Sequence, residues 1–280
     1  MQRFLLLCVL TLIGTESTLA QHSTLNFSSD PIRLNQQSIL MVPLQQKMFI
    51  TDINKDLADA NKMTSSQLID RFTTAIDQVF RYTFEDKCTL SSFYLIEDQE
   101  AEEDLRYIYE NLGLEYELVS KTIEKKGIEK FKSKIKKPKD EDYQRGQIHN
   151  GEIITRRDPR ERYMKAVVKD PKMLDSMQTK FGNRFFLFVN ELDINTVYGN
   201  THEMSRMNYE REIKLHYTLY HENGEILSTG ISKTRFPSQL NDIDLIIKNY
   251  FPKLAEYIYD DLFPPPEEGK PKINLSPWKK

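Results

Sequence analysis

One stretch of this sequence alternates strictly between apolar and polar residues, and it constrains the fold more than any other feature. Its apolar side chains occupy every second position; they are Ile213, Leu215, Tyr217 and Leu219. An Asn223-Gly224 pair follows, and a second strand-like run covers residues 226–231. Alternation of period two on both sides of Asn-Gly predicts an antiparallel β-hairpin with one buried face. The polar positions between them, such as Lys214 and His216, are expected on the other face.

Further strands are indicated by short apolar runs. Arg184 to Val189 is almost continuously apolar and aromatic, as in a central strand, and the polar residues after it indicate a half-exposed end. We expect three strands to lie side by side and antiparallel: residues 184–195, 210–221 and 225–235. Residues 38–44 predict a short buried strand that closes at Pro43.

Helices are indicated by capping residues and by apolar spacing. Thr64 stands three residues before Gln67, as in a capping box, and apolar residues then recur at helical spacing through residue 82. Asn241 or Asp242 would cap a final helix over residues 242–262, which Pro252 would kink or divide. Shorter helices are expected from the acidic run 97–104 onward, with Gly113 as C-cap, and over residues 171–181.

These elements predict an α+β fold. The sheet is expected to be mixed and mainly antiparallel, with the helices 64–82 and 242–262 packed on one face. Residues 21–263 would form a single domain, and the Pro/Lys-rich residues 264–280 an exposed tail. No predicted element covers the polar face of the sheet, so that face is where a partner is expected.

Residues 1–20 have the pattern of a secretory signal peptide. Arg3 supplies a positive charge, a ten-residue apolar stretch interrupted by Thr11 runs from Phe4 to Ile13, and small residues precede Gln21. The alternatives are an uncleaved anchor or a buried helix. Cleavage would remove Cys8 and leave Cys88 as a lone thiol. We therefore expect an exported protein, periplasmic or extracellular, without a transmembrane segment in its mature form.

The composition changes over residues 121–165. This segment holds 15 Lys and Arg against 8 Asp and Glu, whereas the whole chain has a net charge of −3. We interpret it as a basic, mobile insertion. It is either a solvated loop or a contact with an acidic partner, an anionic lipid surface or a polyanion. The overall charge and the sparse aromatic residues argue against specific nucleic-acid binding.

The sequence contains none of the common catalytic or phosphate-binding motifs. His202, His216 and His221 lie near the hairpin, and a zinc site there would need a third ligand such as Glu203 or Glu222. Solvent-exposed hairpin positions are the favoured explanation of these histidines. Asp193 paired with Glu191 could perform acid-base chemistry, but alternation along a strand also places them together. Cys88 is expected to be buried, with a catalytic role or an intermolecular disulfide as alternatives. We expect no catalytic, cofactor-binding or metal-ligating residue.

The order of elements resembles the small α/β domain of the TolB amino-terminal domain and the CsgG-like envelope proteins. The resemblance rests on the opening strand Ile39 to Leu44 with its proline, the helix 64–82, the strand from Arg184 to Val189 and the hairpin around Asn223-Gly224. It covers about residues 38–262 and identifies no site residue. It implies a non-catalytic module of the bacterial cell envelope that docks other proteins.

Two functions remain open at this level. The first is a secreted or periplasmic protein-interaction or assembly module, whose partners would be other envelope proteins. The second is a secreted hydrolase whose site is assembled from distant residues. A pocket where acids and a histidine converge would favour the hydrolase, whereas an exposed sheet face or strand edge would favour the interaction module.

Overall fold

The structure is a computed structural model, and it describes residues 23–26, 37–95, 99–119, 148–149, 152–153, 161–197 and 209–263. The expectations for the signal peptide, for most of the basic insertion and for the tail lie outside these residues. The described part has the α+β fold expected from the sequence, with a mixed and mainly antiparallel sheet. None of its helices is long and apolar enough to cross a bilayer.

The main sheet has seven strands in the order β1-β11-β10-β9-β2-β4, and β3 pairs with β9 beside this path. Their bounds are Ser23–Asn26 for β1, Ser38–Val42 for β2, Phe49–Thr51 for β3, Thr89–Ser92 for β4, Phe185–Thr196 for β9, Glu210–His221 for β10 and Ile226–Pro237 for β11. β9, β10, β11 and β1 are antiparallel neighbours. β2 is parallel to β9 and β4, and β3 is parallel to β9. The three expected adjacent antiparallel strands are therefore confirmed.

The β10–β11 hairpin is confirmed, with a register shift between Leu219 and Tyr220 beside the turn. The N–H of Gly224 donates to the C=O of His221 at 2.9 Å, and the φ of Gly224 is 85°, a conformation that favours glycine. The apolar set of β10 faces one side of the sheet and is fully buried; its members are Ile213, Leu215, Tyr217 and Leu219. The turn and the pleat thus set the register that the alternation predicted.

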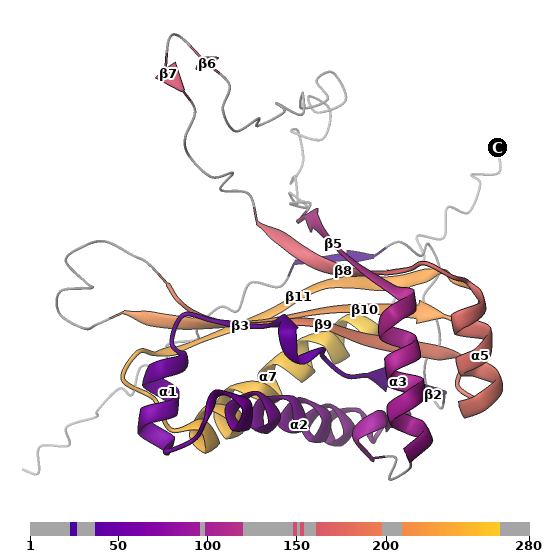
Figure 1. The fold of residues 1–280 in the computed structure, drawn as a ribbon, viewed down its shortest axis with the longest axis horizontal. Coiled ribbons are helices and arrows are strands. Elements are labelled where there is room, and N and C mark those ends of the chain that lie inside the picture. Colours follow the sequence, from indigo (N-terminus) through magenta and orange to yellow (C-terminus); the bar gives the residue numbers. More distant parts are fainter. Residues whose placement is uncertain are drawn as a thin grey trace, which may run out of the picture.

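Two long helices cover this first face of the sheet. They are α2 (Ser65–Phe84) and α7 (Ile243–Leu262), and the short α1 (Asn54–Asn61) lies beside α2. Figure 1 shows α2 and α7 running along one side of the sheet. Thr64 and Gln67 form the expected capping box, and the Asp242 side chain accepts from the N–H of Leu245. α7 contains Pro252 within one helix and is not divided.

The second face is covered as well, which corrects the expectation of an open polar face. Strands β5 (Leu112–Leu118) and β8 (Arg162–Val168) form a two-stranded antiparallel ribbon, which crosses the sheet opposite α2 and α7 (Figure 1). Helices α3 (Gln99–Asn111) and α5 (Lys172–Phe181) bury their apolar residues in the same second cluster. Gly182, with φ of 70°, ends α5 as expected. A further described pair is β6 (Ile148–His149) with β7 (Glu152–Ile153).

Two sequence expectations are corrected by these elements. Gly113 is not a C-cap, because α3 leads directly into β5 and Gly113 pairs with Val167 inside the strand. The residues between β2 and α2 include the 3-10 turn η1 (Gln46–Met48), β3 and α1. Residues 162–165, placed by composition in the basic insertion, form the first half of β8. After α2 the chain forms β4 and then the 3-10 turn η2 (Phe93–Leu95).

The ends of the basic segment lie next to each other, which permits a defined deletion. The N–H of Val119 donates to the C=O of Glu161 at 2.9 Å, so β5 and β8 are still paired where the segment leaves them. Replacing residues 120–160 with Asn-Gly would close a tight hairpin at that point. We expect the melting temperature to stay within a few degrees, as followed by circular dichroism. Loss of folding in this variant, with a longer Gly/Ser bridge failing too, would show that the segment is structural.

Candidate functional site

A β-bulge in β9 prepares a polar site on the second face. His216 lies opposite Glu191, but the next residue, Tyr217, lies opposite Val189, so one residue of β9 is extra. A bulge of this kind places two consecutive residues on the same side of a sheet. Here those residues are Asn190 and Glu191, and both are buried. The bulge therefore places the Glu191 side chain on the second face. Without the bulge, regular pleating would point this side chain toward the core on the first face.

Four side chains of this face hydrogen-bond the backbone of β8; they are Asn190, His216, Thr218 and Tyr220. We call this set the β8 seat. His216 Nδ1 and Thr218 Oγ1 accept from the N–H groups of Met164 and Ala166, at 2.7 and 3.1 Å. Asn190 Nδ2 and the Tyr220 hydroxyl donate to the C=O groups of the same two residues, each at 2.9 Å. Side chains thus replace the neighbouring strand that this edge of β8 would otherwise need.

Two carboxylates adjoin the seat. His216 Nε2 lies 3.5 Å from Glu191 Oε1 and 3.5 Å from Asp193 Oδ2. Glu191 Oε2 accepts from the hydroxyl of Tyr116 on β5 at 2.6 Å. His216 and Glu191 are each 1% exposed. Burial raises the pKa of Glu191, although the Tyr116 hydrogen bond and the nearby His216 act in the opposite direction.

Glu191, Asp193 and His216 offer ligand atoms within 4.8 Å of one another, a donor set that could suit a metal ion. The hydrogen bond at Nδ1 argues against this use. Because Nδ1 accepts from a backbone N–H, the ring proton of neutral His216 must lie on Nε2, the atom that would have to bind the ion. Metal-binding histidines normally donate from their other ring nitrogen. The residues therefore do not fit a metal centre while β8 is seated.

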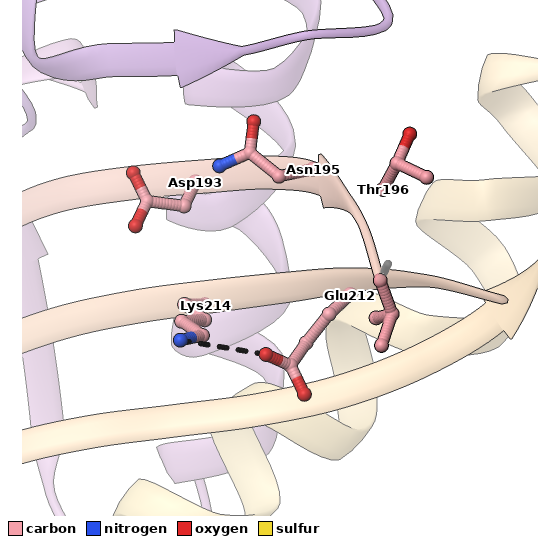
Figure 2. A pocket seen from close by; sticks show the side chains of 6 residues that line it. Asp193, Asn195, Thr196, Glu212 and Lys214 are labelled. Carbon is pink, nitrogen blue, oxygen red and sulfur yellow. Dashed lines mark ion pairs between the residues drawn. The ribbon is translucent and has the colours of Figure 1, made fainter. Parts of the chain in front are cut away.

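A pocket of about 180 Å³ opens beside these carboxylates, at the ends of β9 and β10 (Figure 2). Its lining residues are Asp193, Asn195, Thr196, Val197, Glu212 and Lys214. Lys214 pairs with Glu212 at 3.4 Å and with Glu161 at 3.2 Å. Asp193 Oδ1 is buried and has no hydrogen-bond partner among the described residues. The pocket is smaller than the roughly 300–1,000 Å³ of most small-molecule sites.

Three exposed side chains lie on strands that adjoin this pocket. Ile50 of β3 is 42% exposed and lies opposite Asp193 in the parallel register, on the same face. Tyr116 is 50% exposed and reaches Glu191 through its hydroxyl. Leu118 is 36% exposed and lies opposite Arg162, next to the Glu161 that binds Lys214. We call the pocket with Ile50, Tyr116 and Leu118 the rimmed pocket.

The structure brings together only some of the candidate site residues that were considered from the sequence. It brings Glu191 and Asp193 together with His216, which the sequence had grouped with His221 instead. His221 packs against the ring of Phe185, and Glu222 pairs with Arg184 at 2.8 Å, so neither joins the site. His202 and Glu203 lie outside the described residues.

Cys88 is buried, as expected. Burial, with a smaller contribution from Asp86, raises the pKa of its thiol to about 11. A thiol with such a pKa is a poor nucleophile at neutral pH, which argues against the catalytic alternative.

Sequence reasoning missed the β8 seat. A signal for the bulge was present, because Asn190-Glu191 places two polar residues in succession within an alternating strand. The contact with β8 leaves no local pattern.

The comparisons with known proteins do not identify a family. No family model and no curated protein matches the chain. Among solved structures it is similar to the PelC dodecamer from Paraburkholderia phytofirmans, with a TM-score of 0.31 and 7% identity over 85% of this chain and 97% of that chain. A PelC variant dodecamer from the same organism gives a TM-score of 0.30 and 6% identity over 85% and 98%. A likeness of this size carries no inference about this chain.

Proposed function

We propose that this protein is an exported, non-enzymatic interaction or assembly module of the bacterial cell envelope. The observation that carries the proposal is the rimmed pocket. It combines charged lining residues with the exposed side chains of Ile50, Tyr116 and Leu118 on adjoining strands. Exposed apolar groups beside a polar pocket are typical of surfaces that bind proteins. The signal-peptide pattern and the resemblance to TolB-like and CsgG-like domains support export and an envelope location, periplasmic or extracellular.

The charges of the pocket indicate which partner fits. The ion pairs among the described residues join Lys214 to Glu161 and Glu212, whereas they give Asp193 no Lys or Arg partner. A basic side chain from the partner, flanked by apolar neighbours, would supply the missing charge and cover the rim. We therefore propose a partner protein that inserts a lysine or arginine beside Asp193.

The secreted hydrolase remains the second candidate, because acids and a histidine do converge at this site. It is the weaker one, since a general base needs a ring nitrogen that is free to accept a proton. Nδ1 of His216 is engaged by Met164, and Nε2 carries the ring proton. Hydrolysis by the purified protein that disappears in Asp193→Asn would favour this candidate.

Site-specific photo-crosslinking in the organism that encodes the chain tests the interaction function. A photoreactive phenylalanine replaces Ile50 or Leu118, and in the matched control it replaces Tyr82, which is 76% exposed on α2 on the opposite side of the sheet. We expect one protein to be crosslinked from the rim positions and not from position 82. The uncrosslinked protein recovered from the same cells should have the intact mass of a chain that begins at Gln21, as expected after removal of the signal peptide.

A second variant makes the result specific to the pocket. Asp193→Asn should reduce the crosslinks from position 50 while leaving the melting temperature within a few degrees. Equal crosslinking from all three positions, or crosslinks indifferent to Asp193, would contradict the proposal. A crosslink that forms only within the chain and disappears when residues 120–160 are replaced with Asn-Gly would also contradict it, because the basic segment would then be the occupant.

A further inference from the structure

His216 holds β8 through a ring atom that must stay unprotonated. Its Nδ1 accepts the N–H of Met164 at 2.7 Å, and both groups are buried. A protonated imidazole donates from both nitrogens and accepts at neither. Proton uptake at Nδ1 would therefore set one N–H against another and remove this bond of the β8 seat.

The surroundings of Nε2 have the opposite effect, because they favour a protonated, positively charged imidazole. Glu191 and Asp193 of β9 each place an oxygen 3.5 Å from Nε2, and this atom has no good hydrogen bond among the described residues. The opposing charge is Lys214 on the same strand, and Glu161, which precedes β8, is paired with it.

Of the neighbouring described strands, β11 carries the cation Lys233, which is paired with Glu161 at 3.0 Å. β5 contributes the Tyr116 hydroxyl to Glu191, and β11 places the uncharged Ile231 opposite His216. Neutral His216 thus stabilises the arrangement in which β8 is bound to the seat. Charged His216 instead interacts favourably with the carboxylates of Glu191 and Asp193. The cluster has two exclusive arrangements that differ by one proton.

We propose that proton uptake by His216 releases β8 from its seat, so that pH controls whether the β5–β8 ribbon lies on the sheet. Release would also withdraw Tyr116 and Leu118 from the rimmed pocket. The release is a property of the chain itself and does not depend on the proposed function.

Backbone hydrogen exchange of the full-length protein tests this at pH 7.5 and pH 5.0. The readout is the protection factor, which corrects for the pH dependence of exchange itself, at Met164 and Ala166. We expect protection of both amides to fall by ~10-fold or more at pH 5.0, the change that corresponds to losing about one or two buried hydrogen bonds. The amide of Leu215, in the centre of the main sheet, serves as the internal reference.

Two variants separate protonation from simple loss of the seat. In His216→Asn the side-chain oxygen takes the place of Nδ1 and does not titrate, so protection should be the same at both pH values. In Thr218→Val the hydrogen bond from the N–H of Ala166 is lost, but His216 is unchanged. The difference in protection between this variant and the wild type should therefore show the effect of losing one seat bond without a change in the titrating group. Asp77 is a buried acid on α2, and Asp77→Asn should leave the effect intact, which excludes a contribution from this carboxyl.

The protonation state of the ring provides a second measurement that needs no variant. Nitrogen-15 NMR should show His216 protonated only at Nε2 at pH 7.5 and at both nitrogens once β8 has lost protection. Unchanged protection in the wild type at pH 5.0 would overturn the proposal. So would a fall in His216→Asn equal to that in the wild type, or a ring that becomes charged while β8 remains protected.

Discussion

Replacing Leu215 with alanine is expected to destabilise the folded protein by about 2–5 kcal/mol, the usual cost of removing a fully buried leucine side chain. Leu215 is 0% exposed in the middle of β10, with β9 and β11 as its neighbours and the α2–α7 layer over it. Two strands and two helices are held in place around it, so the cavity cannot close by a small movement of a loop. Urea unfolding followed by circular dichroism measures the loss.

The adjacent residue provides the matched control. Lys214 lies on the second face, where an exposed position would make Lys214→Ala cost about 0.5 kcal/mol or less. The structure instead places its side chain at 27% exposure, paired with Glu161 and Glu212. Both partners keep a second cation, Lys233 and Arg235 respectively, so we expect a cost of about 1 kcal/mol. A greater loss from Lys214→Ala than from Leu215→Ala would show that the two faces are inverted.

Replacing Asp77 with asparagine is expected to stabilise the protein at neutral pH. Asp77 lies on α2 and is 1% exposed, its Oδ1 accepts from the hydroxyl of Ser92, and its Oδ2 has no hydrogen-bond partner among the described residues. Burial raises the pKa of this carboxyl from 3.8 to about 6, against smaller opposing effects of Ser92 and Arg81. The folded protein therefore favours the protonated form more strongly than the unfolded chain does.

The sign of the pH dependence follows from that difference. The stability associated with protonated Asp77 is fully present below about pH 4 and is lost as pH rises through about 6. At about 1.4 kcal/mol per pKa unit the total loss is about 3 kcal/mol. In Asp77→Asn the side chain is neutral at every pH, so this part of the pH dependence should disappear. The variant should be about 1–3 kcal/mol more stable than the wild type at pH 7.5.

Urea unfolding between pH 4 and pH 7.5 measures the effect as the difference between variant and wild type. Asp70→Asn is the matched control, because Asp70 is an exposed carboxylate on the same helix. It should leave the pH dependence unchanged. If Asp77→Asn and the wild type lose stability in parallel as pH rises, Asp77 is ionised in the folded protein at little cost and its burial has been misjudged.

The elements that could be predicted from the sequence share one property: their signals lie within a few residues of each other. The alternation around Asn223-Gly224 encodes the hairpin, and the capping box of Thr64 with Gln67 marks the start of α2. Periodicity also assigned the buried face of β10 correctly. In each case the side chains that decide the structure are neighbours in the local geometry of a strand, a turn or a helix.

Gly113 shows where such signals mislead. Glycine after a helical run is a common C-cap, but here the helix passes directly into β5, whose pairing with β8 supplies the hydrogen bonds that end it. The partner strand begins about fifty residues later in the sequence. Local propensity could not include the hydrogen bonds that this strand offers.

The sequence by itself determined the α+β class, the central hairpin, the long helices of the first layer and the burial of Cys88. Only the tertiary structure decided what covers the second face and which polar residues meet there. Met164 and His216 are 52 positions apart, and their contact depends on the bulge at Asn190-Glu191 and on the path of β8. No period or cap records such a contact, because its free energy exists only once both segments are in place.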